Sequence, residues 1–376
     1  MLPILLVTSK NFEKRLDFDI LILMVGRRSV ARKLVLLLIF IIIVGTGYFL
    51  WPKRQPLSDW QIKQQQERIL SMMKTKLPET PVLSKTLPII SYVLPNATCY
   101  YFAGASVAHF LEKDIDFDKF LWYGRPLRFK FDRRFGDLRT GPPAGDLFME
   151  AFYNLGYKTY QGNTSRILMP AIFMTHMTAD DNFIFFKKQA EAFDFIKRLI
   201  SADQPVILNG APTPNMAKGD YGFFAGYNDN FVYIRPIPDK YPFYYQEPEI
   251  LTTFYEVPIK KFLEIWNRTE NTFYWFEKTH ERISEGEIYQ MNKADAQETY
   301  SNMQKFINNL SQGAGLKSYS SNGDGINSRA AASRYLRKAG YSQLADKYME
   351  IAKLYNENED FSKIAEREKE AAKLWQ

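Results

Sequence analysis

The segment 221–235 constrains the fold of this chain strongly. Two runs of aromatic and β-branched residues, YGFFAGY and FVYIR, flank the triplet Asn228-Asp229-Asn230. Asn and Asp tolerate the left-handed backbone that tight turns require, and aromatic and β-branched residues favour strands. The pattern therefore predicts a β-hairpin, and with it an antiparallel sheet.

Weaker signals on both sides of the hairpin complete the predicted fold. Strands are expected at 157–161, 172–175, 205–209, 252–256 and 272–276. Helical periodicity and end signals predict helices at 58–76, 99–112, 114–123, 143–155, 179–200 and 259–266, and then at 283–310, 329–339, 341–355 and 360–374. The predicted fold class is α+β, with an α-helical C-terminal region.

Residues 34–51 form an apolar run without a charged residue, LVLLLIFIIIVGTGYFLW. Its length suffices for a helix that spans a bilayer, and basic residues precede it. The sequence thus predicts a single-pass membrane protein with an uncleaved signal anchor, embedded in lipid. Its N-terminus is expected in the cytoplasm and its C-terminal domain outside. Met24, which precedes Val-Gly-Arg-Arg, is an alternative translation start to Met1.

The predicted chain has five parts: a cytoplasmic segment (1–33), the anchor (34–51), a stalk (52–82), an α+β domain (83–280) and a helical region (281–376). A single cysteine excludes an intramolecular disulfide, and three histidines argue against a histidine-rich metal site. Much of the net charge of +7 lies before residue 34, which argues against nucleic acid as a partner. We expect no metal and no cofactor.

Cys99 is the only cysteine, and it follows Pro95, Asn96 and Thr98, which favour a turn and a helix start. At the first turn of a helix, unpaired N–H groups and the helix dipole lower the pKa of a thiol. Cys99 is therefore a candidate nucleophile. The alternative is that it is a small buried apolar residue.

Several motifs occur in an order that resembles a known family. Cys99 opens a helix; GPPAGDL begins at Gly141; ADQPVILN ends at Asn209; GYNDNFVYI begins at Gly226; and FYEVPIKKFLEIW ends at Trp266. Over residues 83–280 this order resembles a papain-like cysteine peptidase domain of the bacteriocin-processing (double-glycine leader peptidase) type. RAAASRYLRKAG, which starts at Arg329, is similar to the helical tail of butirosin-biosynthesis acyltransferase-like proteins.

The resemblance implies a papain-like cysteine-hydrolase fold, in which a helix carrying the cysteine packs on an antiparallel sheet. It also implies a histidine base at the start of the hairpin, but Asp220 stands there. A carboxylate is a poor base for a thiol, because its pKa is usually near 4. The acid of the family falls near Arg235 and Pro236, and its oxyanion glutamine falls at Val93.

Two other residues are candidates for the missing roles. Asn96 is a possible oxyanion donor, although it also suits a turn, and His176, in a predicted loop, is a possible base. His109 is ten residues beyond Cys99 on the same predicted helix, about 15 Å away, which is too far for a base. His280 follows the last predicted strand and is expected at the surface.

Three functions remain open from the sequence. The first is a catalytically degenerate papain-like domain that binds a peptide or related ligand in a cleft rimmed by Tyr100, Tyr101, Tyr221 and Phe223. The second is an active cysteine peptidase or acyltransferase that uses Cys99. The third is a scaffold whose C-terminal helices dock a partner protein.

Overall fold

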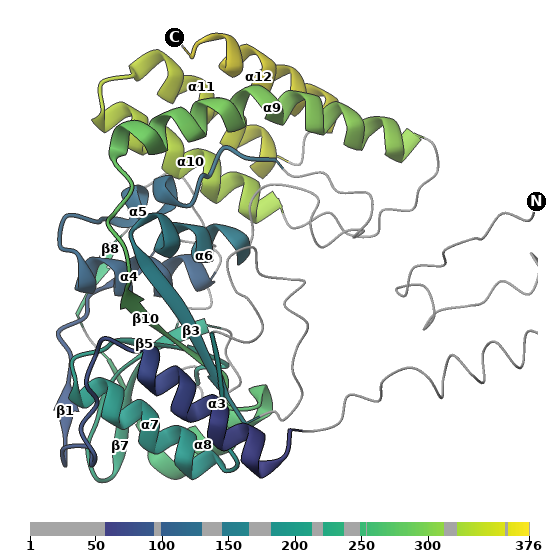
Figure 1. The fold of residues 1–376 in the computed structure, drawn as a ribbon. Coiled ribbons are helices and arrows are strands. Elements are labelled where there is room, and N and C mark those ends of the chain that lie inside the picture. The colour runs from purple at the N-terminus through teal and green to yellow at the C-terminus, as the bar shows by residue number, and fades with distance from the viewer. Residues whose placement is uncertain are drawn as a thin grey trace, which may run out of the picture. The chain divides into compact units, whose positions relative to one another are not determined.

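The computed structural model describes residues 57–93, 99–129, 145–164, 182–212, 221–236, 249–252, 254–311, 322–357 and 360–375. Residues 56–376 form one compact unit. Within the described ranges the fold is α+β, with the helices α3 to α12 and the strands β1 to β10 (Figure 1).

A mixed sheet of eight strands forms the centre of this unit. Its order is β4-β3-β10-β5-β6-β7-β9, with β1 also paired to β6. The pairs are antiparallel except for β3 and β4, which run parallel. The strands are β1 (Lys85–Thr86), β3 (Tyr157–Asn163), β4 (Phe183–Phe185), β5 (Val206–Asn209), β6 (Tyr221–Tyr227), β7 (Phe231–Pro236), β9 (Tyr255–Pro258) and β10 (Phe273–Lys278). Strands β2 (Ser91–Val93) and β8 (Glu249–Leu251) pair separately.

Helices cover both faces of the sheet (Figure 1). On one face lie α4 (Cys99–Leu111) and α6 (Gly145–Asn154), and Phe152 of α6 stacks on Phe276 at 3.7 Å between ring centroids. On the other face lie α7 (Gln189–Ser201) and α8 (Ile259–Trp266), where Phe195 packs edge-on against Trp275. The sheet is therefore buried on both sides, and aromatic side chains form much of its core.

The C-terminal helices α9 (Glu285–Ser311), α10 (Asn322–Lys338), α11 (Ser342–Asn356) and α12 (Phe361–Lys373) pack on one another and on α5 (Phe117–Tyr123). They hold the segment that follows α5. Arg329 donates hydrogen bonds to the carbonyls of Pro126 and Leu127 at 2.7 and 3.0 Å. Its Nε forms a fully buried ion pair with Glu368 at 2.8 Å. The helical region is thus joined to the core through buried polar contacts.

The structure confirms the predicted hairpin as β6 and β7, with Asn228 Oδ1 accepting the N–H groups of Asn230 and Phe231 in the turn. The single helix predicted over 179–200 is wrong. Phe183–Phe185 form the strand β4, and the helix α7 starts only at Gln189. Consecutive apolar residues suit a strand that is buried on both faces, and the Lys187-Lys188 pair separates it from the helix.

Residues predicted as a stalk include the helix α3 (Asp59–Met72), which begins with a capping box between Ser58 and Gln61. This helix lies along β4 at the edge of the sheet. After it, Thr75 donates hydrogen bonds to Glu277 from its amide and its hydroxyl, at 3.2 and 3.1 Å. The segment is therefore packed against the domain and not extended away from it.

The predicted membrane anchor requires a correction. No helix in the part of the chain that the structure describes is both long and apolar enough to cross a bilayer. Helix α4 is apolar, but its 13 residues span about 20 Å of the roughly 30 Å required, and α9 has 27 residues but is polar. Residues 34–51 lie outside the described ranges. The predicted fold with a transmembrane helix, and the signal anchor and single-pass localisation derived from it, therefore have no support in the structure.

Candidate functional site

Cys99 is the first residue of α4, the helix that packs on β5 and β6, but its side chain and that of Tyr100 lie outside what the structure describes. Asn96, His176 and Asp220 also fall outside the described residues. The roles predicted for these five residues therefore stay predictions. What the structure does describe around the predicted site is the part of the sheet on which α4 packs.

The other three predicted site residues are described. Tyr101 and Phe223 are buried in the core, where Phe223 packs edge-on against Phe254. Tyr221, the first residue of β6, is half-buried and stacks on Tyr274, with ring centroids 6.0 Å apart. Of these three side chains, only Tyr221 reaches the surface to an appreciable extent.

Polar side chains cross the sheet on the face that α6 covers. The strand register aligns Gln161 with Tyr274, Tyr274 with Ile207, and Ile207 with Phe223. Two residues along the strands from Ile207 and Phe223, the register aligns Asn209 with Tyr221. Asn163 likewise lies two residues beyond Gln161 on β3. Paired residues point to the same face. We call this set the polar strip: Gln161, Asn163, Asn209, Tyr221 and Tyr274.

The polar strip is buried at one end and accessible at the other. Gln161 and Asn163 are 7% and 4% exposed, whereas Asn209 and Tyr221 are half-buried. The side-chain oxygens of Gln161 and Asn163 have no hydrogen-bond partner among the described residues. Burial, and then the neighbouring Tyr221, raise the pKa of Tyr274 well above its usual value, so its hydroxyl stays protonated. The strip therefore combines acceptor atoms that lack a donor with a neutral phenol.

α4 and α6 lie close together above this face. A Cβ atom added at Gly104 of α4 would lie 2.6 Å from the ring of Phe120 and 2.8 Å from that of Phe148 on α6. Phe148 in turn packs edge-on against Tyr274 of the polar strip. The glycine thus allows the helix that begins with Cys99 to approach the helix that covers the strip.

Arg235 lies near the position that the resemblance predicts for the acid. It pairs with Phe223 in the register of β6 and β7, next to the start of β6. Its side chain is 5% exposed, and its guanidinium lies 5.8 Å from the centroid of the Tyr255 ring. A buried cation here is the opposite of the group that stabilises an imidazolium ion.

The two histidines that the structure describes are bound to backbone carbonyls elsewhere. His109, near the C-terminal end of α4, contacts the Ile115 carbonyl through Nδ1 at 3.0 Å. His280 contacts the Tyr153 carbonyl through Nε2 at 2.8 Å and packs against the ring of Tyr153. Neither lies at the N-terminal end of α4, where a base for Cys99 is needed.

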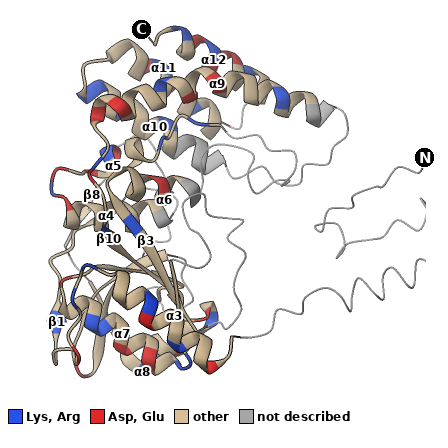
Figure 2. Ribbon diagram, in the orientation of Figure 1, with Lys and Arg blue, Asp and Glu red and all other residues tan. Residues whose placement is uncertain are grey.

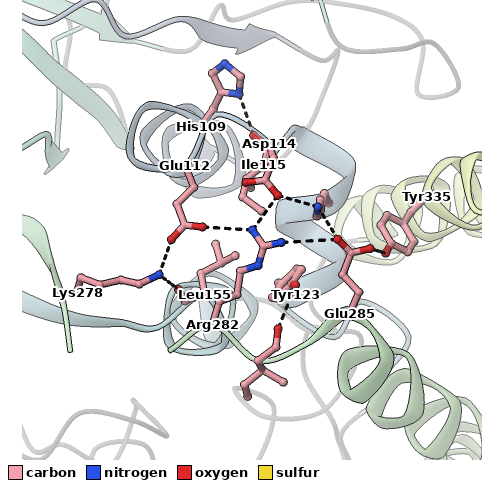
Figure 3. A network of polar contacts seen from close by, with 12 residues as sticks. His109, Glu112, Asp114, Ile115, Tyr123, Leu155, Lys278, Arg282, Glu285 and Tyr335 are labelled. Atoms are coloured by element: carbon pink, nitrogen blue, oxygen red, sulfur yellow. Dashed lines mark hydrogen bonds and ion pairs between the residues drawn. The ribbon is translucent and has the colours of Figure 1, made fainter. Parts of the chain in front are cut away.

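A second polar cluster joins the end of α4 to α5, α9 and α10 (Figure 3). Arg282 contacts Glu112, Asp114 and Glu285 at 3.2, 2.8 and 3.7 Å. Lys119 contacts Asp114 and Glu285, and Lys278 contacts Glu112. We call these six side chains the Arg282 network. Each has a partner of opposite charge, and Tyr335 of α10 donates a hydrogen bond to Glu285. The Arg282 network therefore serves to hold these elements together.

Other charges are mixed in sign. Helices α7, α8 and α12 each carry both basic and acidic residues (Figure 2). Within the described ranges, no three His, Cys, Asp or Glu side chains gather closely enough to hold a metal ion. The expectations about nucleic acid, metals and cofactors remain predictions.

The sequence contained a signal for the polar strip that the prediction did not use. Gln161 and Asn163 alternate with Tyr160 and Gly162, which is the pattern of a strand with one polar face. Such a face is usually solvated, but in this fold α6 covers it. Burial of the polar face depends on a helix that precedes the strand and cannot be inferred from the strand alone.

The chain matches no protein-family model, no curated protein and no solved structure. The resemblance to papain-like domains therefore depends on the motifs quoted above.

Proposed function

We propose that the domain binds a peptide or related ligand along the polar strip, which the ligand enters at the accessible end, and does not cleave it. The observation that supports binding most directly is the pair of buried amide oxygens on Gln161 and Asn163, for which the described residues offer no donor. A buried acceptor without a partner costs about 1–3 kcal/mol, and such groups in folded proteins usually have a water or ligand partner. Main-chain N–H groups of a peptide are suitable donors.

Three observations support the absence of catalysis. Arg235 lies near the position predicted for the acid, His109 and His280 are engaged with carbonyls, and Asp220 stands at the position predicted for the base. In a papain-like arrangement the cleft lies beside Cys99 and the hairpin, which agrees with a ligand that enters past Asn209 and Tyr221. We therefore propose a degenerate papain-like domain that binds its ligand without cleaving it.

Binding is tested by equilibrium dialysis of the full chain against a pool of random octapeptides, with mass spectrometry of the retained peptides. We expect the unmodified protein to retain a reproducible set, and Asn163→Leu to retain about tenfold less, since one hydrogen bond to a buried acceptor is lost. Tyr160→Phe is the matched control, because it changes the opposite face of the same strand. If the unmodified protein retains no peptide, or if Asn163→Leu binds normally, the proposal is wrong.

Catalytic competence is tested by alkylation of Cys99 with iodoacetamide as a function of pH, with Cys99→Ala as the control for reaction elsewhere. Without a base partner, we expect reaction only above about pH 8.5, the value of a free thiol, or no reaction in the folded state. Rapid alkylation near pH 6 would show a stabilised thiolate. It would favour the alternative function, an active cysteine peptidase or acyltransferase.

A further inference from the structure

The strand β4 is an edge of the main sheet, and its outward groups face α3. On its inner side, the amide of Gln161 donates to the Asn182 carbonyl at 2.8 Å, and the amide of Phe186 donates to the Asn163 carbonyl at 3.0 Å. Backbone groups in a strand alternate in direction from one residue to the next. The main-chain groups of Phe183 and Phe185 therefore point away from β3, toward the edge that α3 covers.

Two glutamines of α3 bind these outward groups. Gln65 Nε2 donates to the Phe183 carbonyl at 2.8 Å, and Gln66 Nε2 donates to the Phe185 carbonyl at 2.6 Å. The two carbonyls are two residues apart, about 7 Å along the strand, which is the spacing of successive donors on a neighbouring strand. The side-chain amides of α3 thus replace the donors of a missing strand.

The apolar attachment of α3 is slight, although Asp59 at its start also pairs with Lys187 at 3.0 Å. Of its 14 residues, only Ile62 and Ile69 are fully buried. Open grooves flank the helix on both sides. One, of about 670 Å³, is lined by Gln61, Gln64 and Phe185, among others, and the second, of about 480 Å³, is lined by Leu70, Ile184 and Phe195, among others. The stronger anchors come after the helix, where Thr75 binds Glu277 and Arg198 Nε donates to the Pro78 carbonyl.

We propose that α3 is a displaceable cover of β4 and that its displacement opens β4 to pairing with β4 of a second copy of this chain. In an antiparallel pair centred on Ile184, Phe183 of one copy opposes Phe185 of the other. Each opposed pair exchanges two hydrogen bonds, so a closed two-fold contact forms. The run Phe183–Phe186 contains no charge and no proline, the features that usually prevent pairing at an edge.

The test uses the full-length double variant Gln65→Ala/Gln66→Ala. Light scattering over a wide concentration range should show a doubling of mass that the unmodified protein lacks. At low concentration, amide hydrogen exchange in residues 182–186 should be about tenfold faster, because two hydrogen bonds that hold the cover are lost. At high concentration the exchange should slow again as the edges pair.

The matched control is Lys63→Ala/Gln64→Ala, which changes two exposed residues of the same helix and should behave as the unmodified protein. Gln65→Asn/Gln66→Asn keeps both amides but shortens their reach, and it should dimerise like the alanine variant. Unchanged amide exchange at residues 182–186 in both glutamine variants would contradict the proposal that α3 covers β4. Faster exchange in a protein that remains monomeric at every concentration would overturn the pairing.

Discussion

The Arg282 network and the polar strip are two polar regions of one domain that differ in how their groups are satisfied. In the network, six charged side chains from distant segments pair with one another (Figure 3). In the strip, neutral amides lie under α6, and the oxygens of Gln161 and Asn163 have no partner among the described residues. The more strongly charged region is thus the better satisfied of the two.

The difference suggests separate roles. Ion pairs that join α9 and α10 to the core, such as Arg125 with Asp295 and Arg334 with Asp118, fix how the helical region docks. Amide acceptors that find no donor among the described residues add nothing to the fold there, which favours a role in binding. A scaffold function for the C-terminal helices, with their apolar surface free for a partner, receives less support, because Arg329 of α10, held by Glu368 of α12, binds the carbonyls of residues 126 and 127 of the core.

The largest expected effect is at the buried pair of the helical region. Arg329→Met leaves the carboxylate of Glu368 buried without its cation. It also removes the Arg329 hydrogen bonds to the carbonyls of Pro126 and Leu127, although the Leu127 carbonyl keeps the one from the Thr299 hydroxyl. We expect the free energy of unfolding to fall by about 3–5 kcal/mol, measured from urea midpoints. Arg329→Met/Glu368→Leu should recover part of this loss.

The matched control for that experiment is Arg337→Met. Arg337 pairs with Asp346 at the surface of the same helix, where both side chains are more than half exposed. Its loss should cost under about 1 kcal/mol. Equal effects of Arg329→Met and Arg337→Met would mean that the buried pair does not secure the docking of the helical region.

A smaller effect is expected from acid. The hydrogen bond from Lys119 lowers the pKa of Glu285, although burial opposes it. For Asp114, burial acts to raise the pKa, but the hydrogen bonds from Arg282 and Lys119 outweigh it. A lowered folded pKa confers stability above the unfolded value, and this stability is lost as the pH falls through the folded value.

Below about pH 4, the contribution of the Arg282 network to the free energy of unfolding should therefore fall by about 1 kcal/mol, after allowance for solvent screening. Urea midpoints at neutral and acid pH measure the loss, and Glu285→Gln should reduce it. Glu368 contributes to stability with the opposite sign. Burial raises its pKa, so protonation in acid removes the cost of keeping a charged carboxylate buried. An acid response identical in Glu285→Gln and the unmodified protein would exclude this contribution of the network.

The smallest effect on stability is expected in the polar strip. Gln161→Leu removes an acceptor that has no donor in the described part of the chain, so the free energy of unfolding should change by less than about 1 kcal/mol or rise. Gln189→Leu is the contrast. Its amide donates to the Leu263 carbonyl at 2.6 Å and to Asn271 Oδ1 at 2.7 Å, and its loss should cost about 1–3 kcal/mol. Equal losses in both variants would remove the distinction between the two kinds of buried amide.

Local patterns in the sequence predicted many individual elements. The hairpin at 221–235, the helix at 259–266 and the strand at 205–209 are close to their observed positions. The strand β4 was missed, because four consecutive apolar residues beside a helical pattern do not distinguish a buried strand from a helix. Its identity depends on pairing with β3, which precedes it by about twenty residues.

The sequence by itself determined the α+β class, the hairpin and the α-helical nature of the C-terminal region, because turn residues and apolar periodicity act over a few neighbouring residues. The tertiary structure decided which faces are buried. It placed α6 over the polar face of β3, α3 along the edge of β4, and Arg329 against Glu368 and the carbonyls after α5. Contacts between segments far apart in the chain have no local signature, so the polar strip and the covered edge became visible only in the folded protein.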